Sequence, residues 1–500
     1  MNGDRDKAPL SLPDRLIGRW MQAADWAQAH RTAVWAIGAP IVVLALLVIN
    51  QRVLLDFPNS GDEYAYLYQA QTMAAGRLWN TPIEPAALFT TSYVVQEPQR
   101  VFGSFPVGWP LALAVPISLG LPPSLLNPVL GALTLVLLWS LGARLYGHRA
   151  GVTAAALVLV SPFFLFNAAS YFSHTFCGAL LLAAACLAAR EDRRPVWVPV
   201  AAGLLIGWAV LARYFTGVVC AVPIVLWMLR PGAARLRTAL LVALGGLPWV
   251  ALLAWYNTSL SGHFWQLTTR PLTVSLWFAD RFWLRGADML ATHVLRHLTW
   301  TPPALLIAYV MYLRFAPRAV RRGLLDWMLV LVAGLLYFYI ERGGNQYGPR
   351  FHYEAFLFVA VFVSGSLAWA WTSARPSRRD RMMTGFLAAS VAAMPVVFTP
   401  HAALERRVIR ERVDPYTQAE RALSGPAIVL IQGRVGTARS MSAADLTRNG
   451  INGGGPVLYG VDPGDADRCA AVAAFPGRAS YVYRWDREAA RGELTPFACR

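Results

Sequence analysis

The sequence predicts an all-α protein that crosses a membrane many times and ends in a small α/β domain. The chain has 500 residues, of which 56% are hydrophobic and only 15% are charged. Its mean hydropathy of +0.41 lies outside the range of ordinary soluble domains. Long apolar runs recur along the chain and short Arg-rich segments separate them. After residue 400, short strand-type runs alternate with Gly, Pro and Asp residues, which is typical of a small α/β domain.

The apolar runs predict about eleven transmembrane helices, because each crossing needs about 20 mostly apolar residues. The first run is interpreted as a retained anchor and not a cleaved signal, since it is long and many further runs follow. The run 105–120 is short and interrupted by prolines, so we expect a re-entrant or interfacial helix there. The expected spans are 33–50, 124–145, 150–167, 172–190, 197–212, 214–230, 238–256, 301–314, 324–340, 352–373 and 383–400.

The net charge of +17 lies largely in short loops between the spans. Arg-rich loops mark the cytoplasmic side of a membrane protein, so the charge is a topology signal and not an indication of nucleic-acid binding. We therefore expect a multi-pass protein of the bacterial inner membrane. Its expected parts are a cytoplasmic segment (1–32), a membrane domain (33–400) with outer loops 51–107 and 257–300, and an extracytoplasmic α/β domain (401–500).

The first outer loop contains the acid pair Asp62 and Glu63 near the start of an amphipathic helix predicted over 59–79. Ser60 or Asp62 can cap this helix, and Gly76 can end it. A purely structural role for the acids is a real alternative, because carboxylates in a first helical turn interact favourably with the helix dipole. Adjacent helical residues point about 100° apart, so at most one of the two is expected to act as a base.

The five cysteines divide between the two environments. Cys177, Cys186 and Cys220 lie in or beside apolar spans, where cysteine commonly serves as a small apolar residue. Cys469 and Cys499 lie in the C-terminal domain. An oxidising compartment would permit a disulfide between them, with two free thiols as the alternative.

Several segments, taken in order, resemble the GT-C glycosyltransferases, the class that includes protein O-mannosyltransferases and the lipid A aminoarabinose transferase. The Gly-Asp-Glu helix after the first span resembles their first outer loop. Further segments agree with this family in order over about residues 33–400: FGSFPVGWPLALA (102–114), GWAVLARYFTG (207–217), YNTSLSGHFW (256–265) and YGPRFHYEA (347–355). The resemblance implies a helical bundle that transfers a sugar from a polyprenyl-phosphate donor to a glycan, lipid or protein acceptor, with inversion.

The resemblance also implies roles for particular residues. Asp62 matches the acid proposed as the general base, and Glu63 stands beside it. Several family members carry a second outer acid where this chain has Ser173 and His174. His174 is a candidate for binding substrate or a proton, whereas a lone histidine at a helix start is more often structural. Arg213 and Arg350 are suited to a phosphate leaving group. The remaining candidates for substrate contact are Tyr64, Tyr347 and His263.

A divalent cation bridging Asp62, Glu63 and the donor phosphate is compatible with the sequence. Motifs for nucleotide-phosphate binding are missing: there is no Walker A loop and no Rossmann glycine pattern. This agrees with a lipid-linked donor. Two alternatives remain open, a transporter or flippase of lipid-linked sugars and an enzyme resembling O-antigen ligases. A transporter would be expected to show internal repeats and polar groups at mid-membrane, whereas here the polar groups gather outside the spans.

Overall fold

The computed structural model describes residues 12–499 apart from 191–194, 230–234, 265–281, 319, 322–345, 373–376 and 452. The expected span 324–340 and residues 265–281 of the expected outer loop 257–300 lie outside the described residues. Each of the other expected spans coincides with a helix or, for 150–167, with a pair of helices.

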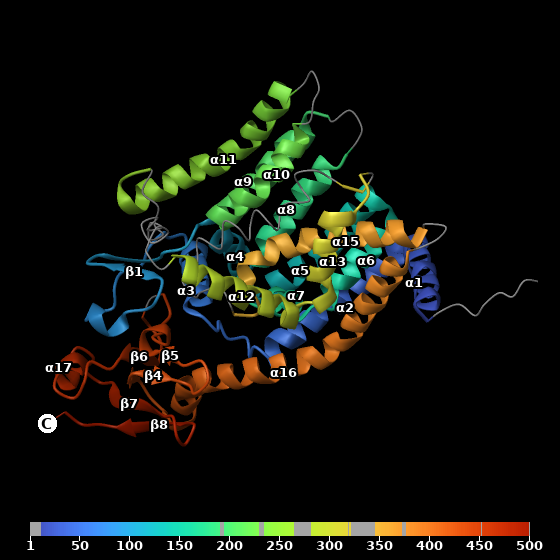
Figure 1. The fold of residues 1–500 in the computed structure, drawn as a ribbon. Helices are drawn as coiled ribbons and strands as arrows, with labels where there is room; N and C mark the ends of the chain where they lie inside the picture. Colours follow the sequence, from blue (N-terminus) through green and yellow to red (C-terminus); the bar gives the residue numbers. More distant parts are fainter. Residues whose placement is uncertain are drawn as a thin grey trace, which may run out of the picture.

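The described part of the chain is mostly helical, and the helices pack into one bundle (Figure 1). Their bounds are α1 Leu12–Ala29, α2 Arg31–Arg52, α3 Gly61–Ala74, α4 Gly108–Ser118, α5 Leu126–Tyr146, α6 His148–Leu159, α7 Pro162–Ala169, α8 His174–Ala188, α9 Trp197–Ala212, α10 Tyr214–Met228, α11 Arg235–Ser261, α12 Phe282–Trp300, α13 Pro303–Phe315, α15 Tyr353–Thr372, α16 Arg378–Ala422 and α17 Arg468–Val472.

The count of about eleven full crossings is not confirmed. Among the described residues, five helices are long and apolar enough to cross a membrane, or six if α6 and α7, which meet at a 70° bend, form one span. The shorter helices include α8, α9, α10 and α13. At a rise of 1.5 Å per residue, the 11 residues of α4 extend only about 16 Å, roughly half of a bilayer's hydrocarbon core. Apolar composition therefore predicted where these helices lie, but several of them are shorter than a full membrane crossing.

The bundle core is built around α15, which is the most enclosed of the candidate spans and contacts α5, α6 and α8. Phenylalanines of α7 and α15 meet there, as in the contact between Phe163 and Phe356. At the edge of the bundle α9 packs against α11 through glycines: a Cβ built on Gly203 would lie 2.0 Å from the carbonyl oxygen of Val242. The backbones of α9 and α11 therefore touch, as small residues allow between membrane helices.

The loop between α2 and α4 holds α3 and a β-hairpin, formed by β1 Val94–Glu97 and β2 Arg100–Gly103. Ser60 caps α3 by accepting a hydrogen bond from the backbone N–H of Glu63 at 3.1 Å. Gly76, with φ +72°, follows the end of the helix. The helix is shorter than the predicted 59–79, but its cap and its terminator are the predicted ones.

The C-terminal region begins inside α16, a helix of 45 residues that starts in the bundle and runs on into the C-terminal domain (Figure 1). The domain boundary predicted at residue 400 therefore falls inside this helix. The expected small α/β domain is present, with a four-stranded sheet in the order β6-β3-β7-β8. The central strand β3 is fully buried and pairs in parallel with β6 and β7. The strands are β3 Ala427–Ile431, β6 Val457–Val461, β7 Ala479–Asp486 and β8 Arg491–Pro496.

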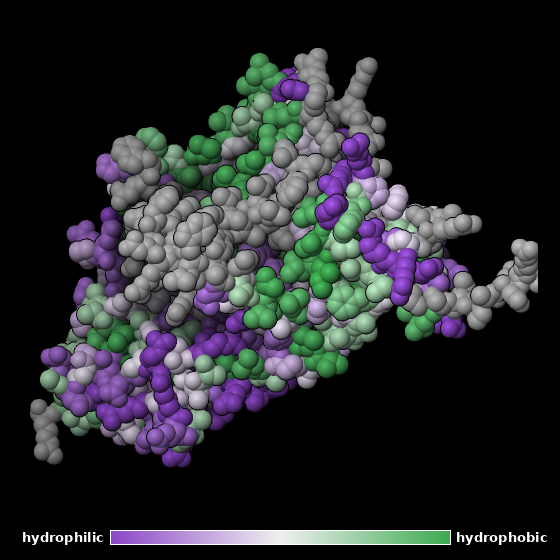
Figure 2. Space-filling model, in the orientation of Figure 1, coloured by the Kyte–Doolittle hydropathy of each residue, from purple (hydrophilic) through white to green (hydrophobic). Residues whose placement is uncertain are grey.

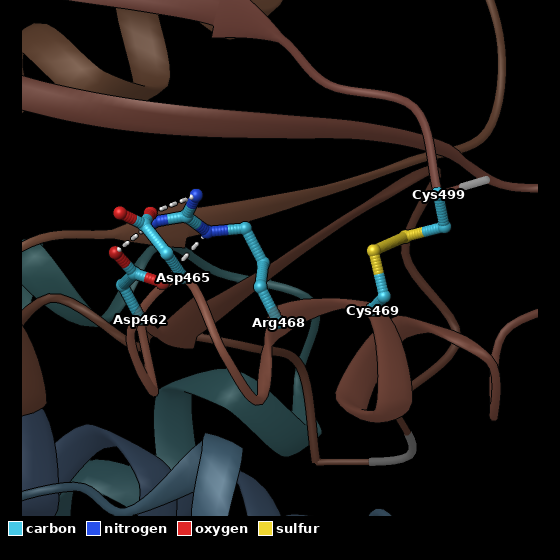
Figure 3. The surroundings of a disulfide bond; sticks show 5 residues. All are labelled: Asp462, Asp465, Arg468, Cys469 and Cys499. Atoms are coloured by element: carbon cyan, nitrogen blue, oxygen red, sulfur yellow. Dashed lines mark hydrogen bonds and ion pairs between the residues drawn. A yellow bond between two sulfur atoms is a disulfide. The ribbon is translucent and has the colours of Figure 1, made fainter.

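A disulfide joins Cys469 of α17 to Cys499 near the end of the chain (Figure 3). Beside it, Arg468 binds both Asp462 and Asp465, at 2.8 and 2.6 Å. The other three cysteines, Cys177, Cys186 and Cys220, are buried free thiols in the bundle. Hydrophilic residues cover the C-terminal domain, and apolar residues dominate the visible surface of helices such as α11 (Figure 2). This distribution fits a bundle in lipid with a water-exposed domain at one end.

Candidate active site

Asp62 lies in the first turn of α3 and forms an ion pair with Arg350. The distance from Arg350 Nη2 to Asp62 Oδ2 is 2.6 Å, and the two side chains are 11% and 16% exposed. Arg350 belongs to a 3-10 turn, η5 Arg350–His352, directly before α15.

Glu63 has different partners from its neighbour. Its side chain is 1% exposed, and it accepts hydrogen bonds from the Tyr171 backbone N–H at 3.0 Å and from Gln346 Nε2 at 3.4 Å. Burial raises the pKa of Glu63 to about 7. The two carboxylates thus do not converge on one point, as their helical spacing predicted. Glu63 joins α3 to two other segments, and Asp62 faces Arg350.

A second buried group of charges lies beside this pair. Arg213, between α9 and α10, places Nε 3.1 Å from Glu354 Oε1 and donates to Ser173 Oγ at 3.3 Å. His174 Nδ1 lies 3.4 Å from the same Glu354 oxygen. Glu354 and His174 are almost fully enclosed, at 0% and 1% exposed. The carboxylate next to His174 therefore comes from α15, which is far along the chain from the segment that holds His174.

The two groups share one aromatic side chain and so form one site. The Arg350 guanidinium carbon lies 5.5 Å from the centre of the Phe351 ring, and that of Arg213 lies 5.7 Å from it. Arg350 also stands 4.1 Å above the ring of Phe172. Arg350 Nε and Nη1 are buried and have no hydrogen-bond partner among the described residues. Unpaired buried donors on a charged group are costly, which points to an anionic ligand or water at this position.

The segment 170–173, which supplies Phe172 and Ser173, joins α7 to α8 and is not helical. Asn127 donates to the carbonyl oxygens of Ser170 and Phe172, at 2.6 and 2.9 Å, and Trp109 donates to that of Tyr171 at 2.8 Å. Side chains of α4 and α5 thus fix this irregular backbone. Irregular backbone inside a membrane bundle is tolerated where protein groups satisfy it or where it lines a cavity.

Three other predicted substrate contacts lie in different surroundings. Tyr347 is 0% exposed, and its hydroxyl accepts a hydrogen bond from Asn59 Nδ2 at 3.3 Å. Tyr64 donates its hydroxyl to the backbone oxygen of Asn449 in the C-terminal domain, at 2.9 Å. His263 is exposed just after the end of α11. The structure therefore places Tyr64 and Tyr347 in contacts within the protein and His263 at the surface.

Glu354 and a histidine cluster were not among the site residues predicted from the sequence. A carboxylate within the apolar helix α15 is itself a signal, because charges in such helices are costly unless they are paired or functional.

His297 Nε2 lies 3.0 Å from His352 Nδ1, and His293 packs against the same His352 ring at 4.8 Å. Within the described residues, no three His, Cys, Asp or Glu side chains are arranged to hold a metal ion. At Asp62, the cation within ion-pair distance of the carboxylate is the guanidinium of Arg350.

Comparison with known proteins agrees with this fold. A family model described as dolichyl-phosphate-mannose-protein mannosyltransferase matches residues 108–256. The resemblance to GT-C glycosyltransferases is confirmed, and the chain has the fold of these membrane enzymes. Among curated protein sequences, none matches this chain.

The fold similarity to one solved enzyme extends over nearly the whole chain. ArnT from Cupriavidus metallidurans bound to undecaprenyl phosphate is 14% identical, with a TM-score of 0.55, and the match covers 91% of this chain and 93% of that chain. The same protein in its apo state is 14% identical with a TM-score of 0.53, and the match covers 92% and 93% of the two chains. At this level of identity the similarity establishes the fold, and the chemistry has to be argued from the site.

Proposed function

We propose that this protein is an inverting glycosyltransferase that moves a sugar from a polyprenyl-phosphate donor to a cell-envelope acceptor on the outer face of the membrane. One observation supports this above the others. The guanidinium groups of Arg350 and Arg213 lie over the same Phe351 ring, and Arg350 is paired with the carboxylate of Asp62 at 2.6 Å. A base and two phosphate-binding groups are what this transfer requires.

The phosphate would be held mainly by Arg350. Its Nε and Nη1 are buried without a partner among the described residues, and a phosphate has oxygens to accept hydrogen bonds from both. The Arg213 guanidinium stands on the Phe351 ring together with that of Arg350, where a second positive charge stabilises the leaving group. Glu354 and Ser173 hold Arg213 in this position. The solved ArnT structure contains undecaprenyl phosphate, which fits a donor of this class.

Asp62 would act as the general base. Its Oδ2 binds Arg350, and its Oδ1 has no hydrogen-bond partner among the described residues, so one oxygen can receive a proton. In the reaction Asp62 removes the proton of an acceptor hydroxyl, and the hydroxyl oxygen attacks the anomeric carbon. The bond from that carbon to the phosphate oxygen breaks, and its electron pair leaves with the lipid phosphate. Attack and departure on opposite faces invert the anomeric configuration.

The test combines genetics with mass spectrometry of envelope glycans and glycolipids. Deleting the gene should remove one sugar modification. Wild-type protein should restore it, and Asp62→Asn, expressed at the same level in the membrane, should not. Asp465→Asn is the matched control, because this carboxylate is 80% exposed in the C-terminal domain. Restoration by Asp62→Asn would rule out Asp62 as the base, and an unchanged glycan profile in the deletion strain would contradict the proposed transfer.

A further inference from the structure

We propose that the C-terminal domain is part of the active site, and that Arg412 and Arg448 are positioning residues that hold Asp62 in place. The inference rests on the proposed role of Asp62 as base. These arginines come from residues far along the chain, and both bind the short turn 57–60 that leads into α3. Asp62 follows this turn by only two residues.

Arg412, near the end of α16, binds Asn59 twice. Its Nη1 donates to the Asn59 backbone oxygen at 2.6 Å and also to the Asn59 side-chain oxygen. Its Nη2 donates to the backbone oxygen of Arg439 at 2.6 Å, in the turn between β4 Arg434–Val435 and β5 Met441–Ser442. Arg412 is only 8% exposed. One buried guanidinium therefore links the first outer loop, α16 and the C-terminal domain.

Arg448 binds the preceding residues of the same turn. Its Nη1 donates to the backbone oxygen of Pro58, and its Nε donates to that of Asp445 at 2.8 Å. The guanidinium carbon lies 4.3 Å from the ring centre of Phe57 and 5.2 Å from that of Tyr64, which is a residue of α3. Arg448 thus holds the turn by a hydrogen bond to Pro58 and by cation–π contacts with one residue at its start and one after it.

The chain before the helix needs such support. Leu55 and Asp56 have φ values of +55° and +49°, a region that residues other than glycine rarely adopt, so the local sequence does not favour this path by itself. The carbonyl groups of Pro58 and Asn59 precede the helix and have no helical partner. Arginine suits them because one planar group can donate to several oxygens at once.

Further contacts bring the domain right against the start of α3. A Cβ built on Gly61 would lie 2.8 Å from Asp445 Oδ1 and 2.9 Å from the Tyr93 ring. Just before the hairpin, Thr91 and Thr447 are hydrogen-bonded through their hydroxyls at 2.8 Å. Gly61 and Tyr64, on either side of Asp62, therefore contact the C-terminal domain, and a shift of that domain would move the carboxylate relative to Arg350.

The experiment measures sugar transfer and donor affinity for Arg412→Ala, Arg448→Ala and the corresponding Lys variants, purified as full-length protein. Misplacing a catalytic group by about 1 Å costs on the order of 100-fold in rate. We expect kcat to fall by at least about 10-fold in each Ala variant, while the KM for the lipid donor changes by less than about 3-fold. The matched control is Arg434→Ala, because this exposed arginine of the same domain has a side chain that binds only Ser440 among the described residues.

A second readout separates positioning from simple stabilisation. Added guanidinium ion should restore part of the lost kcat in Arg448→Ala, and it should not change the Arg434→Ala control. If the Ala variants fail to accumulate, the Lys variants are used, because they keep the charge but lose the double hydrogen bond. Wild-type kcat in folded Arg412 and Arg448 variants would overturn the inference. Transfer by Asp62→Asn would instead overturn the proposed function, so the two failures are distinct.

Discussion

Replacing Arg350 tests the link between the ion pair and the lipid phosphate most directly. The side chain is 11% exposed, and its Nε and Nη1 have no partner among the described residues. A hydrogen bond to a charged group contributes about 1.5–3 kcal/mol. Losing the equivalent of one such bond to the phosphate should weaken donor binding by roughly 10- to 100-fold. Arg350→Lys keeps the charge without the planar group, so we expect a smaller loss.

The assay is equilibrium binding to detergent-purified protein, with undecaprenyl phosphate and the uncharged undecaprenol as the two probes. The phosphate-dependent part of the affinity should fall in Arg350→Ala, and binding of undecaprenol should not change. Arg100→Ala is the matched control, since Arg100 is a half-exposed arginine of the β-hairpin that pairs with Glu97 at 2.7 Å.

Wild-type affinity of Arg350→Ala for undecaprenyl phosphate would refute this reasoning. So would an equal loss for both probes, because a loss that does not depend on the phosphate would show that the substitution disturbs the lipid-binding region as a whole. An unchanged affinity combined with a lower kcat would show that Arg350 acts on Asp62 and does not bind the lipid phosphate.

Two further predictions concern stability. The folded-state pKa of Glu63, about 7, lies above its ordinary value of 4.5, so stability is full below about pH 4.5 and falls as pH rises through about 7. This pKa difference corresponds to about 3 kcal/mol of folding free energy. In Glu63→Gln the melting temperature should therefore depend less on pH between pH 5 and 8. A pH dependence equal to that of the wild type would contradict the raised pKa of Glu63. Gly203→Ala should lower the melting temperature because its Cβ would meet the Val242 carbonyl at 2.0 Å, whereas Gly38→Ala, with no atom within 4 Å of its Cβ, should not; equal effects would show that the α9–α11 contact yields easily.

The sequence alone determined the features that depend on neighbouring residues. Apolar runs located the helices, because burial in lipid needs a continuous stretch of apolar side chains. Ser60 and Gly76 marked the two ends of α3, since capping is a property of a few adjacent residues. Short strand-type runs after residue 400 likewise predicted the C-terminal sheet.

Only the tertiary structure decided which charged groups meet. Asp62 and Arg350 are 288 residues apart, and neither the partner of Arg213 nor the binding of Arg412 to Asn59 follows from any local pattern. A buried charge requires a partner, but the rule does not say from which helix the partner comes. The packing of α15 against α8 supplies Glu354, and the path of α16 into the C-terminal domain supplies Arg412. These long-range contacts are set by how the whole bundle packs, so the sequence named most of the charged residues of the site but not their pairing.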